Sequence, residues 1–438
     1  MITLRTWLLQ ALILVLAASP ALAFKIEEVT SPGGIKAWLV QDKAIPLIAM
    51  KFSFRGGSVF DPEGKEGVAN FLTGMMDEGA ADLDAATFQR LRDELSFKMD
   101  FDAERDHFEG AFQTLSHNRD ASFDLLKKAL TKPRFDAAPL ELVRQQLLLS
   151  VRERTEDPEH IASAAWMEMA LPGDPYARES SGTLASVGAI SADDLRQAHA
   201  LIFNRRTLEV AVVGDIDAAS LGLLLDRVFG GLPEGQELPA LPQPRFSNGP
   251  ALKIIARDMP QSIIVFGHGG IKRSDPEFIP AYIMSEILGG GSSGTRLTEE
   301  LREKRGLTYG VGADLAPLNR AGLFIGSLGT RNEKAGEALS LVKQELKRMA
   351  EEGPTAKELA DAKTYLTGSY ALRFEGNGTT ASQLLGILQD NLGVGYIATR
   401  NARIEAVTLD QVKAQARRLL QGDKLIVTVV GRPEGLTN

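Results

Sequence analysis

The segment TFQRLRDELSFKMDFDAERDHFEGAFQTL, residues 87–115, contains the pattern from which the fold class of this chain follows. It begins as an amphipathic helix and passes into two alternating runs, which are typical of adjacent strands. The segment RLTEELREKRGLTYGVGADLAPLNRAGLFIGSLGT, residues 296–330, repeats this order of one helix and two strands. Two distant segments of the chain therefore predict the same local unit.

The sequence on either side of these two units repeats as well. Each half opens with two apolar runs that are typical of strands, IKAWLV and LIAMKFSF in the first half and ALKIIARD and SIIVFGHGG in the second. Each half then carries several helical stretches and closes with a strand, which ends in VVGDID or in VVGRPE. This order indicates a long internal duplication, without the short periods of a solenoid.

The Pro-rich stretch LPEGQELPALPQPRFSNGP, residues 232–250, lies between the halves and is typical of a linker. We therefore predict an α+β fold of two homologous domains, residues 24–231 and 251–438. Each domain should be a largely antiparallel β-sheet with helices packed on it, because strand hairpins and helices alternate in both halves. The alternative is a single sheet shared by the whole chain.

The composition is that of a globular protein, with 44% hydrophobic and 24% charged residues among 438. The formal net charge of −8 argues against a nucleic-acid partner, which would need a basic surface. It also provides no attraction to anionic lipid. The chain has no cysteine, which excludes disulfides and thiolate metal sites.

Residues 1–23 predict export. Arg5 precedes an apolar run at residues 7–18, and the tripeptide ALA before Phe24 offers the small residues of a cleavage site. We expect a signal peptide that is removed, and hence a periplasmic protein with no stable membrane anchor after cleavage. The alternative is an uncleaved anchor, for which the apolar run is short relative to a hydrocarbon core of about 30 Å.

The stretch GVANFLTGMMDEGA, residues 67–80, predicts a helix because its apolar residues recur at helical spacing. Asn70 and Gly74 are four residues apart, so they lie on one face of that helix. Gly79 is placed as the residue that ends it.

A family resemblance is carried by this helix, by PEGKEG at residues 62–67 and by ERTEDP at residues 153–158. In these stretches the chain resembles the pitrilysin/insulinase family of zinc peptidases, which includes the mitochondrial processing peptidase. The resemblance extends over nearly all of the chain after the leader, and it implies clam-like halves around a cavity. Members of this family carry H-x-x-E-H on the corresponding helix. Its histidines hold zinc together with a distant glutamate, and its own glutamate is the general base.

In this chain the motif has lost its chemistry. Its first histidine, its glutamate and its second histidine fall on Asn70, Thr73 and Gly74, and the third ligand falls near Ser150. Glu153 is close to that last position, but we do not assign it the role. An amide is a poor zinc ligand, glycine has no side chain, and threonine does not take a proton from water at neutral pH. We therefore expect no cofactor on this chain and expect zinc on a partner subunit.

The histidines of the chain offer no replacement site. No two of them are four residues apart, and we expect each to be a surface or structural residue: His107, His117, His160, His199 and His268. The alternative is a relocated zinc site, which would make the chain an independent peptidase.

The stretch GGGSSGTRLTEELREKRGLTYGV, residues 289–311, is the second candidate site. Its glycine-rich run lacks the G-K-[ST] of a phosphate loop, so we interpret it as a flexible loop. The family resemblance implies that such loops lie near the substrate cavity. The helix after it should end at Gly306, and alternation predicts a strand from Leu307. Arg302 then lies at the end of a helix and Tyr309 at the start of a strand.

The resemblance implies a catalytic role for Arg302 and Tyr309. An Arg…Tyr pair at this spacing lies in the second half of family members, where it holds the substrate backbone and stabilises the oxyanion. One donor of this kind contributes about 3–4 kcal/mol to transition-state binding. From the spacing alone, the alternative is that Arg302 pairs with a helix glutamate such as Glu299, while Tyr309 is a half-buried strand residue with its hydroxyl in solvent.

Together these observations favour a non-catalytic subunit of a periplasmic heterodimeric zinc metalloendopeptidase. A homologous subunit with an intact H-x-x-E-H would hold the zinc. This chain would complete the peptide-binding cavity and supply Arg302 and Tyr309 in trans, and the peptide would be held partly by adding a strand to a sheet edge. The alternative is a non-enzymatic scaffold or peptide-binding protein on the same fold, in which the pair is dispensable.

Overall fold

The computed structural model describes residues 25–247, 249–291 and 294–437. The predicted leader, residues 1–23, lies outside the described residues. None of the helices within the described ranges has the length and apolar content that crossing a bilayer requires.

The first half of the chain forms a six-stranded sheet in the order β1-β2-β8-β3-β7-β6, in which only β2 and β8 are parallel neighbours. Its strands are β1 (Ile26–Thr30), β2 (Lys36–Gln41), β3 (Leu47–Arg55), β6 (Lys98–Ala103), β7 (His107–Leu115) and β8 (Leu208–Gly214). The helices of this half are α2 (Val68–Met75), α3 (Ala85–Glu94), α4 (Arg119–Thr131), α5 (Ala137–Glu156), α6 (Pro158–Ala170), α7 (Leu184–Ala189), α8 (Ala192–Ile202) and α9 (Ala218–Phe229).

The second half forms a five-stranded sheet in the order β11-β12-β10-β13-β9, in which only β13 and β9 are parallel. Its strands are β9 (Ala251–Ala256), β10 (Gln261–Gly269), β11 (Thr308–Pro317), β12 (Gly322–Arg331) and β13 (Ile426–Gly431). The helices are α10 (Phe278–Gly289), α11 (Ala335–Glu352), α12 (Ala356–Gly368), α13 (Asn377–Gln389), α14 (Tyr396–Ala406) and α15 (Leu409–Leu419).

The two sheets confirm the predicted α+β class and the internal duplication. The order β2-β8-β3-β7-β6 of the first sheet corresponds strand for strand to β9-β13-β10-β12-β11 of the second. Strand β1 has no counterpart among the described residues of the second half. The alternative of one shared sheet is wrong, because no described strand of the first half pairs with one of the second.

Each sheet buries one face in its own half through the alternation of its strands. In β3, Met50, Phe52 and Phe54 point into the first core, where they meet Phe108 and Phe112 of β7. Each fully buried side chain of this size contributes about 1.5–3 kcal/mol relative to an exposed one. The corresponding core of the second half gathers around Ile264 and Phe266 of β10 and the inner face of α10.

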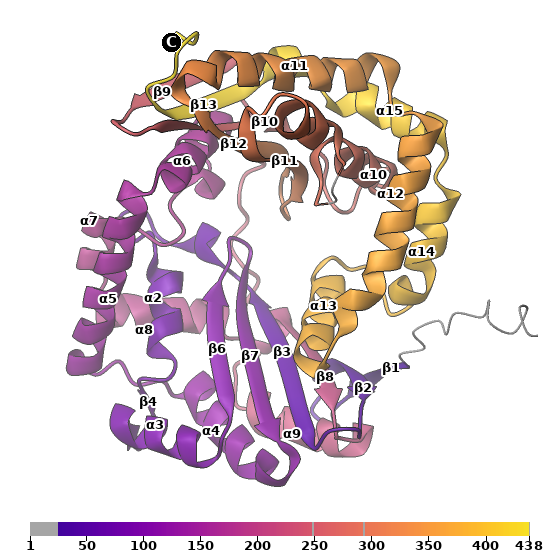
Figure 1. Ribbon diagram of the computed structural model, residues 1–438. Coiled ribbons are helices and arrows are strands. Elements are labelled where there is room, and N and C mark those ends of the chain that lie inside the picture. Colours follow the sequence, from indigo (N-terminus) through magenta and orange to yellow (C-terminus); the bar gives the residue numbers. More distant parts are fainter. Residues whose placement is uncertain (1–24, 248, 292–293, 438) are drawn as a thin grey trace, which may run out of the picture.

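The other face of each sheet is partly covered by a helix of the opposite half (Figure 1). Helix α6 of the first half packs on β10 and β13, and helix α13 of the second half packs on β3 and β8. The fully buried Trp166 of α6 donates from Nε1 to the carbonyl of Ile426 at 2.9 Å, and the Thr428 hydroxyl donates to the carbonyl of Ala162 at 2.7 Å. The expectation that each sheet carries its own helices is therefore incomplete, since two helices are exchanged.

Candidate functional site

The helix of the degenerate motif, α2, begins at a buried carboxylate. Asp61 accepts hydrogen bonds from the backbone N–H groups of Gly67 at 2.7 Å and Ala69 at 3.2 Å, so it satisfies donors that a helix N-terminus leaves open. Burial raises the pKa of Asp61 to about 7, although these hydrogen bonds oppose the shift. Sequence reasoning missed this residue, which lies one position before the PEGKEG stretch.

The same turn requires glycine at position 67. Gly67 has φ = 90°, and a Cβ atom there would lie 2.7 Å from the carbonyl oxygen of Ser181. The first residue of the predicted helical stretch is therefore a left-handed residue in a close backbone approach, which only glycine tolerates well.

Helix α2 ends earlier than the sequence predicts. It stops at Met75 with Met76 as its C-cap, whereas the prediction places its end at Gly79. Gly79 instead lies in the short strand β4 (Gly79–Ala80), which pairs with β5 (Leu83–Asp84), and its φ is 99°. Pairing of this small hairpin explains why the last turn of the predicted helix does not form.

The three motif positions lie on α2 as predicted, and packing against another helix constrains one of them. The Thr73 hydroxyl donates to the backbone carbonyl of Asn70 at 2.7 Å, an interaction within the helix. At Gly74 a Cβ atom would lie 2.9 Å from Cγ1 of Val143 in α5. Helix α5 therefore lies directly against the position at which the second histidine of H-x-x-E-H would stand.

The residues around this position do not fit a zinc ion. Ser150 of α5 is half-buried and Glu153 is exposed, and the nearby side chains of Asn70 and Thr73 are neutral amide and hydroxyl groups. Zinc sites in proteins use imidazole, thiolate and carboxylate ligands. Throughout the described ranges, no three His, Asp or Glu side chains are grouped so that they could hold a metal.

The histidines lie on separate elements. His199 of α8 and His268 of β10 are buried and stack on Phe203 and Phe324, and burial lowers the pKa of each. His160 of α6 pairs with Glu179 at 3.1 Å. The other two lie on β7 (His107) and in the short 3-10 turn that follows it (His117).

The second candidate site follows the predicted change from helix to strand. The chain forms a short π-helical segment, η5 (Thr298–Glu303), and Gly306 with φ = 58° then turns it toward β11. Arg302 lies in the last turn of η5, and Tyr309 is the second residue of β11. Single π-helical turns occur frequently at functional sites.

The side chain of Arg302 is not held by Glu299, the helix glutamate that its spacing suggests. It is 55% exposed, and its Nε lies 3.5 Å from the carboxylate of the adjacent Glu303. Glu299 pairs instead with Lys304 at 3.0 Å. An exposed pair between neighbours is worth little, because solvent screens it and ordering both side chains costs entropy. The Arg302 guanidinium is therefore available to a ligand.

Tyr309 is 89% exposed, so the alternative of a half-buried strand residue is wrong. The register of β11 on β12 shifts between Thr308 and Val311, which marks a bulge that contains Tyr309. The Thr308 hydroxyl stabilises the bulge, since it donates to the carbonyl of Gly310 at 2.7 Å and accepts from its N–H at 3.1 Å. Bulges re-aim side chains near functional sites, and here the aromatic ring is turned into solvent.

The structure does not bring the two candidate sites together. Figure 1 shows α2 and α5 on the left of the molecule at about mid-height, and β11 near its upper centre. Among the described residues, no hydrogen bond or ion pair joins Arg302 or Tyr309 to Asn70, Thr73 or Gly74.

Comparisons with known proteins identify the family of this chain. The family description "Insulinase (Peptidase family M16)" matches residues 39–183, and "Peptidase M16 inactive domain" matches residues 189–366. The crystal structure of a peptidase M16 inactive domain from Pseudomonas fluorescens superimposes with a TM-score of 0.88 at 29% identity, over 94% of this chain and all of that one.

Some relatives that are similar over most of the chain are named as peptidases, and another is named as a non-peptidase. The non-peptidase homolog YmxG of Helicobacter pylori is 28% identical over 78% of this chain and 79% of its own length. An uncharacterized zinc protease of Mycobacterium tuberculosis is 25% identical over 92% of both chains. With its duplicated sheets, its matched residues and its substituted motif, the chain belongs to the insulinase family of peptidases, M16, as a non-catalytic member.

Proposed function

We propose that this chain is the non-catalytic subunit of a periplasmic heterodimeric zinc metalloendopeptidase, and that Arg302 and Tyr309 act in trans at the active site of a homologous subunit. The presentation of Tyr309 is the observation that carries the proposal. Its ring is 89% exposed on an ordered strand, although large aromatic side chains are normally mostly buried. A hydrogen-bonded bulge maintains this exposure, which a partner surface would explain.

The chemistry of the pair suits a peptide backbone. A guanidinium and a phenol hydroxyl both donate hydrogen bonds, and donors directed at developing negative charge stabilise a transition state. Both groups lie beside β11, which is an edge strand of the second sheet. An edge strand leaves backbone N–H and C=O groups unpaired, so an extended peptide adds to it as a further strand.

The first half of the chain would then form part of the wall of the peptide-binding cavity. The α2–α5 contact at Gly74 and Val143 fills the position that a metal ligand would need, so this half completes a cavity without contributing a metal site. The zinc belongs to the partner, which we expect to be a homologous subunit with an intact H-x-x-E-H. The predicted leader supports the periplasm as the location, and relatives named as zinc proteases support a peptidase context.

The test is cleavage of a quenched fluorescent peptide library by three samples: this chain, an H-x-x-E-H subunit encoded beside it, and their mixture. Each sample is assayed with and without a chelator. We expect cleavage by the mixture alone and its loss on chelation, because each subunit supplies a different part of the site.

The alternative function, a scaffold or peptide-binding protein, predicts a different result. Mixing would then leave the rate unchanged, even where the two chains co-elute on size exclusion. Chelator-sensitive cleavage by this chain alone would contradict both functions, since it would require a metal site that the described residues do not form.

A further inference from the structure

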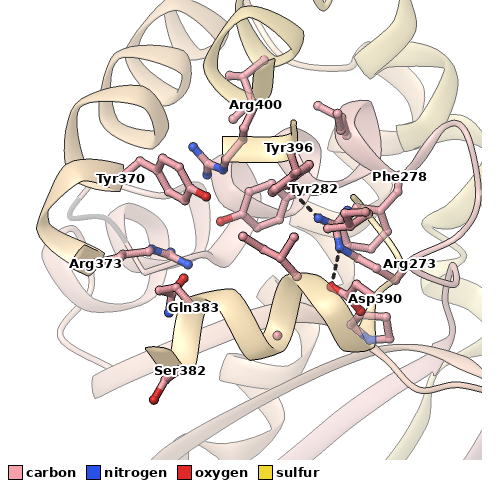
Figure 2. Close-up of a pocket in the computed structure, with 16 residues that line it drawn as sticks. Arg273, Phe278, Tyr282, Tyr370, Arg373, Ser382, Gln383, Asp390, Tyr396 and Arg400 are labelled. Carbon is pink, nitrogen blue, oxygen red and sulfur yellow. Dashed lines mark hydrogen bonds and ion pairs between the residues drawn. The ribbon is translucent and has the colours of Figure 1, made fainter. Parts of the chain in front are cut away.

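A cavity of about 290 Å³ lies in the second half; its lining includes no residue of either candidate site, and no part of the proposed function uses it. Its walls come from α10, α13, α14, the loop after β10 and the 3-10 segment η7 (Ser369–Phe374) (Figure 2). Its volume lies just below the usual range for ligand pockets, about 300–1,000 Å³, so it suits one small group.

A buried positive charge without a counter-ion lies in its wall. Arg400 is 5% exposed and donates to the carbonyl of Leu366 at 2.9 Å and to Oδ1 of Asn401 at 3.0 Å, both of which are uncharged. None of the carboxylates in the described part of the chain forms an ion pair with it. Arginine is almost never buried without a partner, because desolvating an unpaired charge is costly.

Two further donors face the same region. The Arg400 guanidinium lies 4.0 Å from the ring centre of Tyr370, whose hydroxyl has no hydrogen-bond partner among the described residues. Burial raises the pKa of Tyr370 to about 12, so this hydroxyl keeps its proton and donates. Figure 2 shows Arg400, Tyr370, Arg373 and Gln383 on one side of the cavity. Arg373 is exposed and has no ion-pair partner within the described ranges.

On the opposite side of the cavity the charge of Arg273 is neutralised by a carboxylate (Figure 2). There Arg273 pairs with Asp390 at 3.1 Å, donates to the Tyr396 hydroxyl at 2.8 Å and stacks 4.4 Å over the ring of Phe278. The aliphatic residues that line the cavity include Ile279, Ile387, Leu392 and Ile404. Three guanidinium groups therefore share one carboxylate, and the excess charge lies on the side of Arg400 and Arg373.

We propose that this cavity binds a carboxylate with an apolar body, of which a free hydrophobic acid and the C-terminal residue of a peptide are the two sources. The carboxylate would meet Arg400, Tyr370 and Arg373, since a guanidinium fork and a hydroxyl match its planar oxygens. The apolar body would lie against Phe278 and the aliphatic residues. A phosphate fits less well, because phosphate sites are typically built from backbone N–H groups, and the donors here are side chains.

The experiment uses the full chain alone and isothermal titration calorimetry. The probes are N-acetyl-L-phenylalanine, its uncharged amide, a pentapeptide ending in phenylalanine with a free or amidated C-terminus, and inorganic phosphate. We expect the free acids to bind at least tenfold more tightly than the amides, because only they neutralise Arg400. Binding of the peptide acid assigns a peptide end as the source, and binding of the small acid alone assigns a free acid.

The variants avoid Arg400, which also holds the backbone of Leu366. We expect Arg373→Gln to weaken binding of the acids about tenfold and Tyr370→Phe about fivefold, the ranges for a charged and a neutral hydrogen bond. Arg417→Gln is the matched control, since Arg417 is exposed on α15 and outside the cavity, and it should bind as the wild type does.

Three results would overturn the assignment: equal affinity for acids and amides, unchanged affinity in the Arg373→Gln, Tyr370→Phe double variant, and tighter binding of phosphate than of any carboxylate. Because no partner subunit and no cleavage assay are involved, the result is independent of the proposed peptidase role.

Discussion

Gly74 illustrates, at the level of one residue, how packing occupies the position of a lost ligand. Alanine in place of a helical glycine normally gains about 1 kcal/mol, since it reduces the backbone entropy of the unfolded chain. Here the new Cβ would lie 2.9 Å from Cγ1 of the buried Val143, a contact that forces α2 and α5 apart. Overpacking of this kind costs about 1–3 kcal/mol, which exceeds the gain.

We therefore expect Gly74→Ala to lower the free energy of unfolding by about 1 kcal/mol, measured by urea denaturation. Gly188→Ala in α7 is the matched control, because no atom outside its own helix backbone and its chain neighbours lies within 4 Å of the position that its added methyl group would take, and it should not destabilise. Equal stability of the two variants would show that contact with α5 does not constrain position 74.

The positions of the candidate residues follow from the sequence, but their environment does not. Arg302 and Tyr309 lie at a helix end and a strand start, as alternation and Gly306 indicate. The exposure of Tyr309 could not be predicted, because Leu307, Tyr309 and Val311 alternate as in a regular strand. A bulge leaves no mark in that pattern, and it turns the middle residue away from the face that its neighbours share.

At the level of elements, α2 depends on Asp61 for its N-terminus. The folded-state pKa of Asp61 is about 7 and that of an unfolded aspartate is about 3.9. Between these values the folded chain binds a proton that the unfolded chain does not, so stability falls as pH rises. The slope is about 1.4 kcal/mol per pH unit in that window and vanishes above pH 7.

This linkage predicts the behaviour of Asp61→Asn. From pH 5 to pH 8 the free energy of unfolding of the wild type should fall by about 3 kcal/mol. The variant should not show this fall, because its amide side chain does not ionise. Urea denaturation of both proteins at several pH values measures the difference. Parallel stability curves would contradict burial as the dominant effect on this carboxyl group.

Helix α2 ends before Gly79 because a neighbouring element pairs with the residues that follow it. The apolar spacing of residues 67–80 continues to Met76, so periodicity alone extends the helix toward Gly79. The β4–β5 hairpin competes for those residues, and a pair of two-residue strands is too short to leave a period in the sequence.

On the scale of the whole molecule, the exchange of α6 and α13 joins the two halves. Trp166 of α6 is fully buried against the second sheet, and Leu384 and Leu385 of α13 are buried against the first. We do not assign these two helices individually from the sequence. The sequence could not predict which sheet would cover each of them, because an apolar stripe fits either of two similar sheets.

The exchange predicts that the halves do not fold separately. Residues 25–231 and 251–437, expressed alone, should each expose an apolar sheet face, bind a hydrophobic dye and lack a cooperative thermal transition. Their co-expression should restore a single soluble species. A monomeric half with a sharp transition would contradict the interdependence of the two halves.

Trp166→Ala provides the corresponding point test in the intact chain. Loss of a fully buried indole and of its hydrogen bond to Ile426 should cost about 3–5 kcal/mol, read from denaturant midpoints. Trp166→Phe should cost less, because most of the packing remains. A cost below about 1 kcal/mol for the alanine variant would place the stabilising contacts between the halves elsewhere.

The most direct test of the central claim is the catalytic rate of the assembled heterodimer with Tyr309→Phe or Arg302→Gln in this subunit. The matched control is Arg331→Gln, because Arg331 is 60% exposed and, among the described residues, forms an ion pair only with nearby Glu333 at 3.4 Å, as Arg302 does with Glu303. We predict that kcat/KM falls about 10²–10³-fold for each site variant, with the affinity between subunits and the control unchanged. Wild-type rates in both site variants would show that the chemistry proceeds without this subunit's side chains.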